Sequence, residues 1–134
     1  MTILHIDDDP DLRLLLRELA ALAEGEPEIQ VLEAAGLEEA VMRYGSLQPD
    51  TILLDNRLGR ASGVELLARV REVWRCPVWI LTGLPPEVLC ERSRLAGAAG
   101  VVSKDELLRD ATQLRTFLLR CRDPTTDETL ASSC

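Results

Sequence analysis

The stretch ILHIDDDPDL, residues 3–12, places three aspartates directly behind an apolar run that predicts a buried strand. If such carboxylates converge with others in space, each close pair repels by about 4 kcal/mol at an effective dielectric constant of about 20. A cation is the simplest partner for this concentration of negative charge. Pro10, with Asp9 before it as the N-cap, predicts that a helix begins immediately afterwards. The stretch therefore predicts a strand, an acidic loop and a helix in succession.

The other apolar runs repeat this alternation of strand and helix. Strands are expected at 2–6, 29–33, 51–55, 77–81 and 99–102. Helical periodicity is expected at 10–23, 37–46, 63–74, 86–96 and 104–119. Most strand runs are continuously apolar, which is typical of parallel strands covered on both faces. Five strand–helix pairs predict an α/β fold with one parallel sheet, right-handed crossovers and helices on both faces.

Composition limits the classes of partner and compartment. A chain of 134 residues with 46% hydrophobic content suits one compact domain, and its net charge of -8 argues against direct binding of nucleic acid. Its four cysteines form no C-x-x-C pair and no metal-ligand spacing, and no charged-then-apolar leader opens the chain. We therefore expect a cytoplasmic protein with free thiols. No apolar run approaches the ~18 residues that cross a bilayer, so the membrane is not an expected partner.

Polar side chains follow four of the expected strands at their carboxyl ends, where ligands of open parallel sheets bind. Asp7 and Asp8 follow the first strand, Asp55 ends the third, Thr82 follows the fourth and Lys104 follows the fifth. Lys104 is the only lysine, since the other fourteen of the fifteen basic residues are arginine. A lysine offers a compact point charge beside a small anion, where arginine offers a wide fork. The pattern predicts one site that combines carboxylates, a hydroxyl and an ammonium.

The segments HIDDD, PDTILLDNRLGRASGVELL, PVWILTG and GAAGVVSKDEL occur in this order. With these motifs the chain resembles a response-regulator receiver domain of bacterial two-component signalling, over about residues 1–121. The resemblance implies a flavodoxin-like (βα)5 doubly wound fold with the strand order 2-1-3-4-5. Residues 122–134 are polar and lack an apolar period, which predicts a flexible tail or the stub of a linker.

The resemblance also implies a magnesium site. Asp7 and Asp8 would hold Mg2+ together with Asp55 and the main-chain carbonyl of Arg57. The chemistry agrees, because Mg2+ prefers an octahedron of oxygens and keeps several waters, so that few carboxylates suffice.

Asp55 is the phosphoacceptor that the resemblance implies, with Thr82 contacting the phosphoryl group and Lys104 pairing with it. A carboxylate is a competent nucleophile for phosphoryl transfer, and charge on the transferring oxygens needs positive groups already in place. The domain would thus be a signalling phosphoacceptor, not an enzyme with turnover, although it assists its own phosphotransfer and dephosphorylation.

The implied partners follow from this role. A sensor histidine kinase or phosphotransfer protein would donate the phosphoryl group. Phosphorylation would then switch the surface formed by the fourth helix, fifth strand and fifth helix, to control an output domain, a protein target or a homodimer. The ending of the domain, with the residues VSKDE, resembles that of regulators with helix-turn-helix DNA-binding outputs, and such an output would lie outside this domain.

Some positions depart from the family pattern. Asp105 follows Lys104 where a proline with a cis bond is common, so we expect a trans bond, because a cis bond costs a non-proline residue about 3 kcal/mol. Val101 replaces a switching aromatic residue. Gly59 and Gly63 are expected to make the loop after Asp55 permissive. These departures keep open an alternative, a receiver-like interaction module that works without phosphorylation.

A second alternative is a magnesium phosphohydrolase with an aspartate nucleophile. It would need Ser or Thr two residues beyond its second aspartate, and a cap domain, whereas position 11 is Asp and the chain is short. Simple structural roles are expected elsewhere: His5 as a satisfied, partly buried strand residue, and Ser62 and Ser103 as N-caps in S-x-x-E capping boxes.

Overall fold

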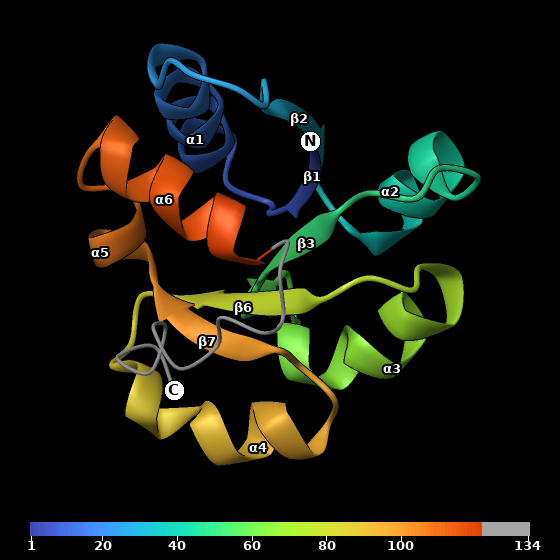
Figure 1. Cartoon of the computed structure of the whole chain (residues 1–134). Coiled ribbons are helices and arrows are strands. Elements are labelled where there is room, and N and C mark those ends of the chain that lie inside the picture. Colours follow the sequence, from blue (N-terminus) through green and yellow to red (C-terminus); the bar gives the residue numbers. More distant parts are fainter. Residues whose placement is uncertain (122–134) are drawn as a thin grey trace.

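A five-stranded parallel sheet forms the centre of the fold (Figure 1). The computed structural model describes residues 1–121. The expected flexible tail at 122–134 lies outside the described residues. The strands are β1 (Thr2–Ile6), β2 (Gln30–Ala34), β3 (Thr51–Asp55), β6 (Val78–Thr82) and β7 (Gly100–Ser103). Their order is β2-β1-β3-β6-β7, and every pairing within the sheet is parallel. The predicted order 2-1-3-4-5 is confirmed.

Helices cover both faces of this sheet, as its continuously apolar strands require. The helices are α1 (Pro10–Leu22), α2 (Leu37–Tyr44), α3 (Gly63–Val73), α4 (Cys90–Leu95), α5 (Lys104–Leu107) and α6 (Ala111–Cys121), with a 3-10 turn, η1 (Pro86–Val88), before α4. α1, α5 and α6 pack on one face, and α2, α3 and α4 pack on the other (Figure 1). Successive strand residues point to opposite faces of the sheet. Ile3 therefore packs in the core under α1, α5 and α6, and Leu4 packs in the core under α2, α3 and α4.

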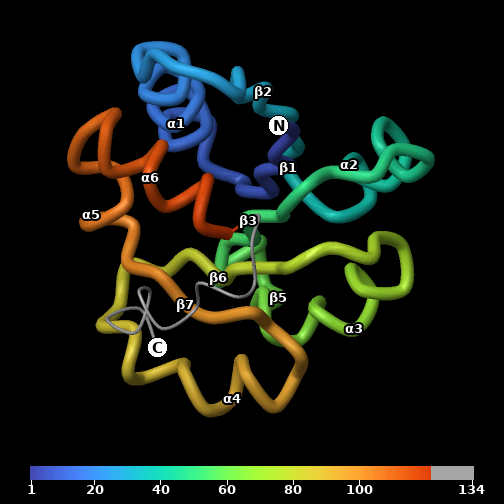
Figure 2. The backbone as a smooth tube through the Cα atoms, viewed as in Figure 1, coloured from blue at the N-terminus to red at the C-terminus, as the bar shows by residue number. Residues whose placement is uncertain are grey.

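The backbone tube shows the chain passing alternately through the central strands and the helices around them (Figure 2). Asp9 caps α1 as predicted, because its side chain accepts the N–H groups of Asp11 and Leu12. Ser62 caps α3 in the predicted capping box with Glu65. The helices that follow β1 and β3 therefore both begin at capped N-termini, and these two helix starts flank the predicted site.

Four local expectations were wrong. The helix expected at 104–119 is two helices, because Asp110 accepts the N–H of Gln113 and starts α6 anew. The helix expected at 86–96 begins with η1 before α4. The side chain of Ser103 makes no capping hydrogen bond. Three strands, β2, β6 and β7, begin one residue later than expected, because apolar runs do not mark where ladder hydrogen bonds start.

The loop after Asp55 also contains a short antiparallel pair, β4 (Arg57–Leu58) and β5 (Ala61–Ser62), which the sequence did not predict. Among residues 1–121 the one cis peptide bond is Glu26–Pro27, so the bond after Lys104 is trans, as expected. Cys90 forms a disulfide, which corrects the expectation of a free thiol at this residue, whereas Cys76 is free as expected. Pairing depends on approach in space, which spacing along the chain does not reveal.

Within residues 1–121, no helix is both long enough and apolar enough to cross a membrane.

Gly100 supplies a test of the packing between β6 and β7. It pairs in register with Trp79, and a Cβ at this position would lie 2.5 Å from the indole ring. The ring is held edge-on against Phe117, with centroids 5.0 Å apart, so it has little room to move. We expect Gly100→Ala to lower the free energy of unfolding by about 2 kcal/mol, as overpacking does.

Urea denaturation measures this effect, with Gly83→Ala as the matched control. No heavy atom lies within 4 Å of a Cβ built at Gly83. The control should change stability by less than about 0.5 kcal/mol. Equal stabilities for the two variants would show that the indole of Trp79 is not fixed against β7.

Candidate functional site

The carboxyl ends of β1 and β3 bring the predicted aspartates together. Asp7 and Asp8 follow β1, and Asp55 is the last residue of β3, the strand beside β1. One carboxylate oxygen of each lies within 4.8 Å of the other two. Asp7 and Asp55 are buried, whereas Asp8 is exposed. Three carboxylates therefore converge, as the opening stretch of the sequence predicted.

Lys104 provides the positive charge beside them. It is the first residue of α5, directly behind β7, and its side chain is 21% exposed. Its Nζ lies 2.8 Å from Asp55 Oδ1 and 3.8 Å from Asp7 Oδ2. The ammonium thus contacts both buried carboxylates and lies closer to that of Asp55.

Backbone N–H groups fix the two aspartates that follow β1. The N–H of Asp9 donates to Asp7 Oδ1 at 2.9 Å, and the N–H of Gly59 donates to Asp8 Oδ2 at 3.0 Å. Gly59 has a φ of 64°, in the left-handed region that glycine adopts without steric cost. Asp8 therefore ties the end of β1 to the turn between β4 and β5, across the mouth of the cluster.

The pKa values of the two buried aspartates shift in opposite directions. Burial raises the pKa of Asp55, the charge of Asp7 raises it further, and Lys104 only partly opposes the rise. Burial also acts to raise the pKa of Asp7, but hydrogen bonding from His5 and the Asp9 backbone, with the charge of Lys104, holds it below its usual value. Asp7 thus holds its negative charge more firmly than Asp55 does.

Thr82 and Arg57 lie at the same edge of the sheet. Thr82 ends β6 and is 1% exposed, and its Oγ1 accepts the N–H of Leu84 at 2.9 Å. Its hydroxyl proton remains available for donation, because a hydroxyl donates once and accepts elsewhere. Arg57 begins β4, two residues after Asp55. The structure therefore gathers every predicted site residue at this edge.

Gly63 has a different role from the permissive one expected. It begins α3, and a Cβ on it would lie 2.5 Å from the carbonyl oxygen of Asp55. Its own N–H donates to the carbonyl of Asn56 at 2.7 Å. The missing side chain lets α3 approach the end of β3 closely, so glycine here fixes the position of Asp55 and does not loosen the loop.

The donor set of this cluster fits a hard divalent cation. All three candidate ligand atoms are carboxylate oxygens, which Mg2+ and Ca2+ prefer. Asp7 Oδ2 and Asp55 Oδ1 are buried without a hydrogen-bond donor of good geometry, apart from the contacts that Lys104 makes with both of them and that His5 makes with Asp7. Two nearby buried carboxylates need more positive charge than one ammonium supplies.

His5 differs from its expected role as a satisfied, partly buried residue. It is fully buried in β1, and neither ring nitrogen has a well-aligned hydrogen bond. Its Nε2 lies 3.4 Å from Asp7 Oδ2. A single histidine in an apolar run forms no motif; the available signal was strand alternation, which places residues 5 and 7 on the same face.

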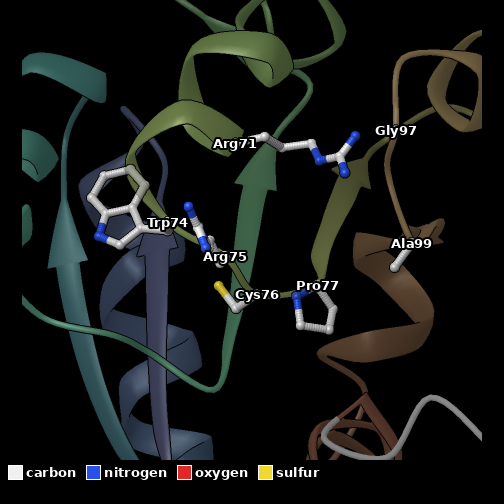
Figure 3. A pocket seen from close by; sticks show the side chains of 7 residues that line it. All are labelled: Arg71, Trp74, Arg75, Cys76, Pro77, Gly97 and Ala99. Atoms are coloured by element: carbon white, nitrogen blue, oxygen red, sulfur yellow. The ribbon is translucent and has the colours of Figure 1, made fainter.

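A cavity of about 450 Å³ lies at the opposite edge of the sheet, beside the amino ends of β6 and β7 (Figure 3). Its lining residues are Arg71, Trp74, Arg75, Cys76, Pro77, Gly97 and Ala99. Burial, with the charge of Asp50, raises the pKa of the Cys76 thiol to about 11. The thiol is therefore protonated at neutral pH and is a weak nucleophile. None of the predicted site residues lines this cavity.

A doubly wound sheet that presents an acidic triad and a lysine at its carboxyl edge defines the receiver class of signalling domain. The family model of the response regulator receiver domain matches residues 3–115. The chain belongs to this family, in which the domain is a phosphoacceptor signalling module. The acidic triad is typical of the metal site of a receiver.

Similar proteins agree with this assignment. The nitrate/nitrite response regulator NarL of Escherichia coli K12 is 36% identical over 108 residues, covering 78% of this chain and 48% of NarL. The chain thus spans about half the length of that relative. A response regulator from Burkholderia pseudomallei, solved with a phosphorylated aspartic acid, calcium and citrate, has a TM-score of 0.73 at 22% identity, covering 97% of this chain and 71% of that one. The chemotaxis regulator CheY4 of Vibrio cholerae has a TM-score of 0.72 at 21% identity, covering 90% and 97%.

Proposed function

We propose that Asp55 accepts a phosphoryl group from a sensor histidine kinase or a phosphotransfer protein, in a reaction that depends on Mg2+. The observation that supports this most strongly is the 2.8 Å contact between Lys104 Nζ and Asp55 Oδ1, inside a cluster of three carboxylates. A lone ammonium held against a buried carboxylate has little purpose in a purely structural pair, because replacing such pairs with apolar residues is often neutral or stabilising.

The chemical step is a direct displacement at phosphorus. A carboxylate oxygen of Asp55 attacks the phosphorus of a phosphohistidine, the new O–P bond forms as the P–N bond breaks, and the imidazole nitrogen keeps the electron pair of the broken bond. Lys104 donates to an oxygen of the transferring group, and the hydroxyl of Thr82 donates to another. Donors that are held in place before the reaction stabilise the charge that spreads over the phosphoryl oxygens, and the contact of Lys104 with Asp55 supports this role.

Four residues would hold the cation: Asp8 and Asp55 through their carboxylates, Arg57 through its carbonyl, and Asp7 chiefly through a water molecule. When bound, Mg2+ supplies charge neutralisation for the carboxylates and the phosphoryl oxygens. Asp8 is suited to direct contact, because it is the exposed member of the triad and the N–H of Gly59 holds it at the mouth of the cluster.

The expected readout is a change at the surface formed by α4, β7 and the helices after it. Thr82 ends β6, whose following loop leads through η1 into α4, and Lys104 joins β7 to α5. Both residues that would contact the phosphoryl group are therefore connected along the chain to that surface. Drawing them toward new negative charge would bias two arrangements of the surface. The partner is an output domain, a protein target or a second copy of the chain.

The domain organisation and cellular setting follow from the same role. Residues 1–121 would form the receiver, and residues 122–134 a tail or the start of a linker to an output domain. The likeness to relatives that are described as transcription regulators, such as BvgA of Bordetella pertussis, supports an output in transcription regulation. The chain would act in the cytoplasm, where kinase and phosphodonor are present, and this domain would not bind nucleic acid itself.

Intact mass spectrometry tests the proposal. Incubation with acetyl phosphate and Mg2+ should add one phosphoryl group, and chelation of the cation should prevent the addition. Asp55→Asn should remove it, whereas Asp11→Asn, which changes an exposed acid outside the cluster, should not. An adduct that survives in Asp55→Asn would contradict the assignment. Mg2+ binding without any adduct from several donors would favour the phosphorylation-independent interaction module.

A further inference from the structure

His5 occupies a position in β1 that an apolar side chain would ordinarily fill. Its neighbours in register are Glu33 of β2 and Leu53 of β3, and its side chain is fully buried. Nδ1 has no hydrogen-bond partner there, and Nε2 has only the 3.4 Å contact with Asp7 Oδ2. A buried ring that leaves one nitrogen unpaired makes a poor packing residue, because burial of unpaired polar atoms is unfavourable. Its contact with Asp7 therefore needs a functional explanation.

Asp7 is held from three directions. Its Oδ1 accepts the N–H of Asp9, and its Oδ2 is shared between Nε2 of His5 at 3.4 Å and Nζ of Lys104 at 3.8 Å. Among the side chains of residues 1–121 with a contact to Asp7 Oδ2, His5 alone approaches it from within β1. Because residues 5 and 7 point to the same face of the strand, the imidazole buttresses the carboxylate without reaching the mouth of the cluster.

We propose that His5 is a positioning residue for the site, and that its Nε2–H donates to Asp7 Oδ2 to hold this carboxylate toward Asp8 and Asp55. This inference rests on the proposed function and adds to it the residue behind the carboxylate. His5 touches neither the cation nor the phosphoryl group. It acts as the partners behind metal ligands do, by fixing the orientation and the charge of a group that faces the cation.

The same contact helps to explain where Lys104 points. Asp7 Oδ2 has two cationic or N–H neighbours, whereas Asp55 Oδ1 contacts only Lys104 among the described ion pairs. With His5 serving Asp7, the ammonium leans to Asp55, at 2.8 Å against 3.8 Å. Loss of the imidazole would draw Lys104 toward Asp7 and away from the phosphoacceptor.

A double-mutant cycle tests the proposal, with Mg2+ affinity measured by NMR titration on the full chain. We expect His5→Leu to weaken Mg2+ binding about tenfold, as loss of a partner behind a metal ligand commonly does. His5→Gln, which keeps an N–H donor at a similar reach, should recover most of that affinity. In the Asp7→Asn background, His5→Leu should change nothing further, because the two residues act as one unit. Urea denaturation of each variant verifies that the fold is retained.

The outcomes separate this proposal from the function on which it rests. Affinity that is unchanged in both His5→Leu and His5→Gln, or a loss that is equal in both backgrounds, would overturn the role of His5 while phosphorylation of the wild-type chain stays intact. Absence of Mg2+ binding by the wild-type chain would overturn both proposals. A coupled cycle with full rescue by His5→Gln supports the positioning role, since a residue that only fills space would give no rescue through an N–H donor.

Discussion

Lys104→Ala will slow phosphorylation of the chain by acetyl phosphate by about 10²–10³-fold, the usual loss when one preorganised donor to a transition-state oxyanion is removed. The side chain contacts Asp55 directly at 2.8 Å, and no other lysine exists to replace it. Lys104→Arg will not restore the rate, because a planar fork cannot occupy the place of a compact ammonium beside a small phosphoryl group. Single-turnover rates from intact mass spectrometry measure the effect.

Arg109→Ala is the matched control for this loss, because it removes an exposed positive charge that forms no ion pair with the aspartates of the cluster. It should leave the rate from a small donor within about twofold, since surface substitutions of this kind usually change little. If Lys104→Ala retained a rate as high as that of the control, the ammonium would have no role in transfer, and its contact with Asp55 would be purely structural.

Asp8→Asn will change the free energy of unfolding in opposite directions without and with Mg2+. This is the second largest effect that we expect. Without divalent cations it will raise the free energy of unfolding by about 1 kcal/mol, because it removes one of three like charges whose oxygens lie within 4.8 Å. With the cation, the variant will lack the stabilisation that Mg2+ binding gives the wild type, which is about 2.7 kcal/mol at a Mg2+ concentration near 100 times the Kd. The amide oxygen can still accept the N–H of Gly59, so the backbone contact is retained.

Urea denaturation with EDTA and with Mg2+ measures both effects in one experiment. The wild type should gain stability from the cation, and Asp8→Asn should be the more stable of the two only in EDTA. A wild-type stability that does not change with Mg2+ would show that the cluster does not bind the cation. An Asp8→Asn variant that is less stable than the wild type in EDTA would show that the carboxylates are not destabilised by mutual repulsion.

The order of elements and the edge that holds the site were predictable from particular residues. Continuous apolar runs such as TILLD, 51–55, can be buried on both faces only in a covered parallel sheet, and such a sheet gathers the residues that end its strands. Asp7, Asp8, Asp55 and Lys104 meet for that reason. The strand order that the resemblance implied was enough to predict that these four residues lie close together.

Other features depend on distances between segments and were missed. Asp110 divides the last predicted helix because a local cap competes with continuation of the helical stripe. Gly63 fixes the approach of α3 to Asp55, which only the position of that carbonyl reveals. The role of His5 depends on a 3.4 Å contact, and the sequence around it reads as an ordinary apolar strand.

Peptide mapping of the phosphorylated chain tests most directly whether these segments build a phosphoacceptor site. Borohydride reduces an acyl phosphate to an alcohol, so that a phosphorylated aspartate is recovered as homoserine. After treatment with acetyl phosphate and Mg2+, we expect homoserine at position 55, and no such conversion when the cation is chelated. Homoserine at another acidic position, or no conversion with the cation present, would contradict the role of Asp55.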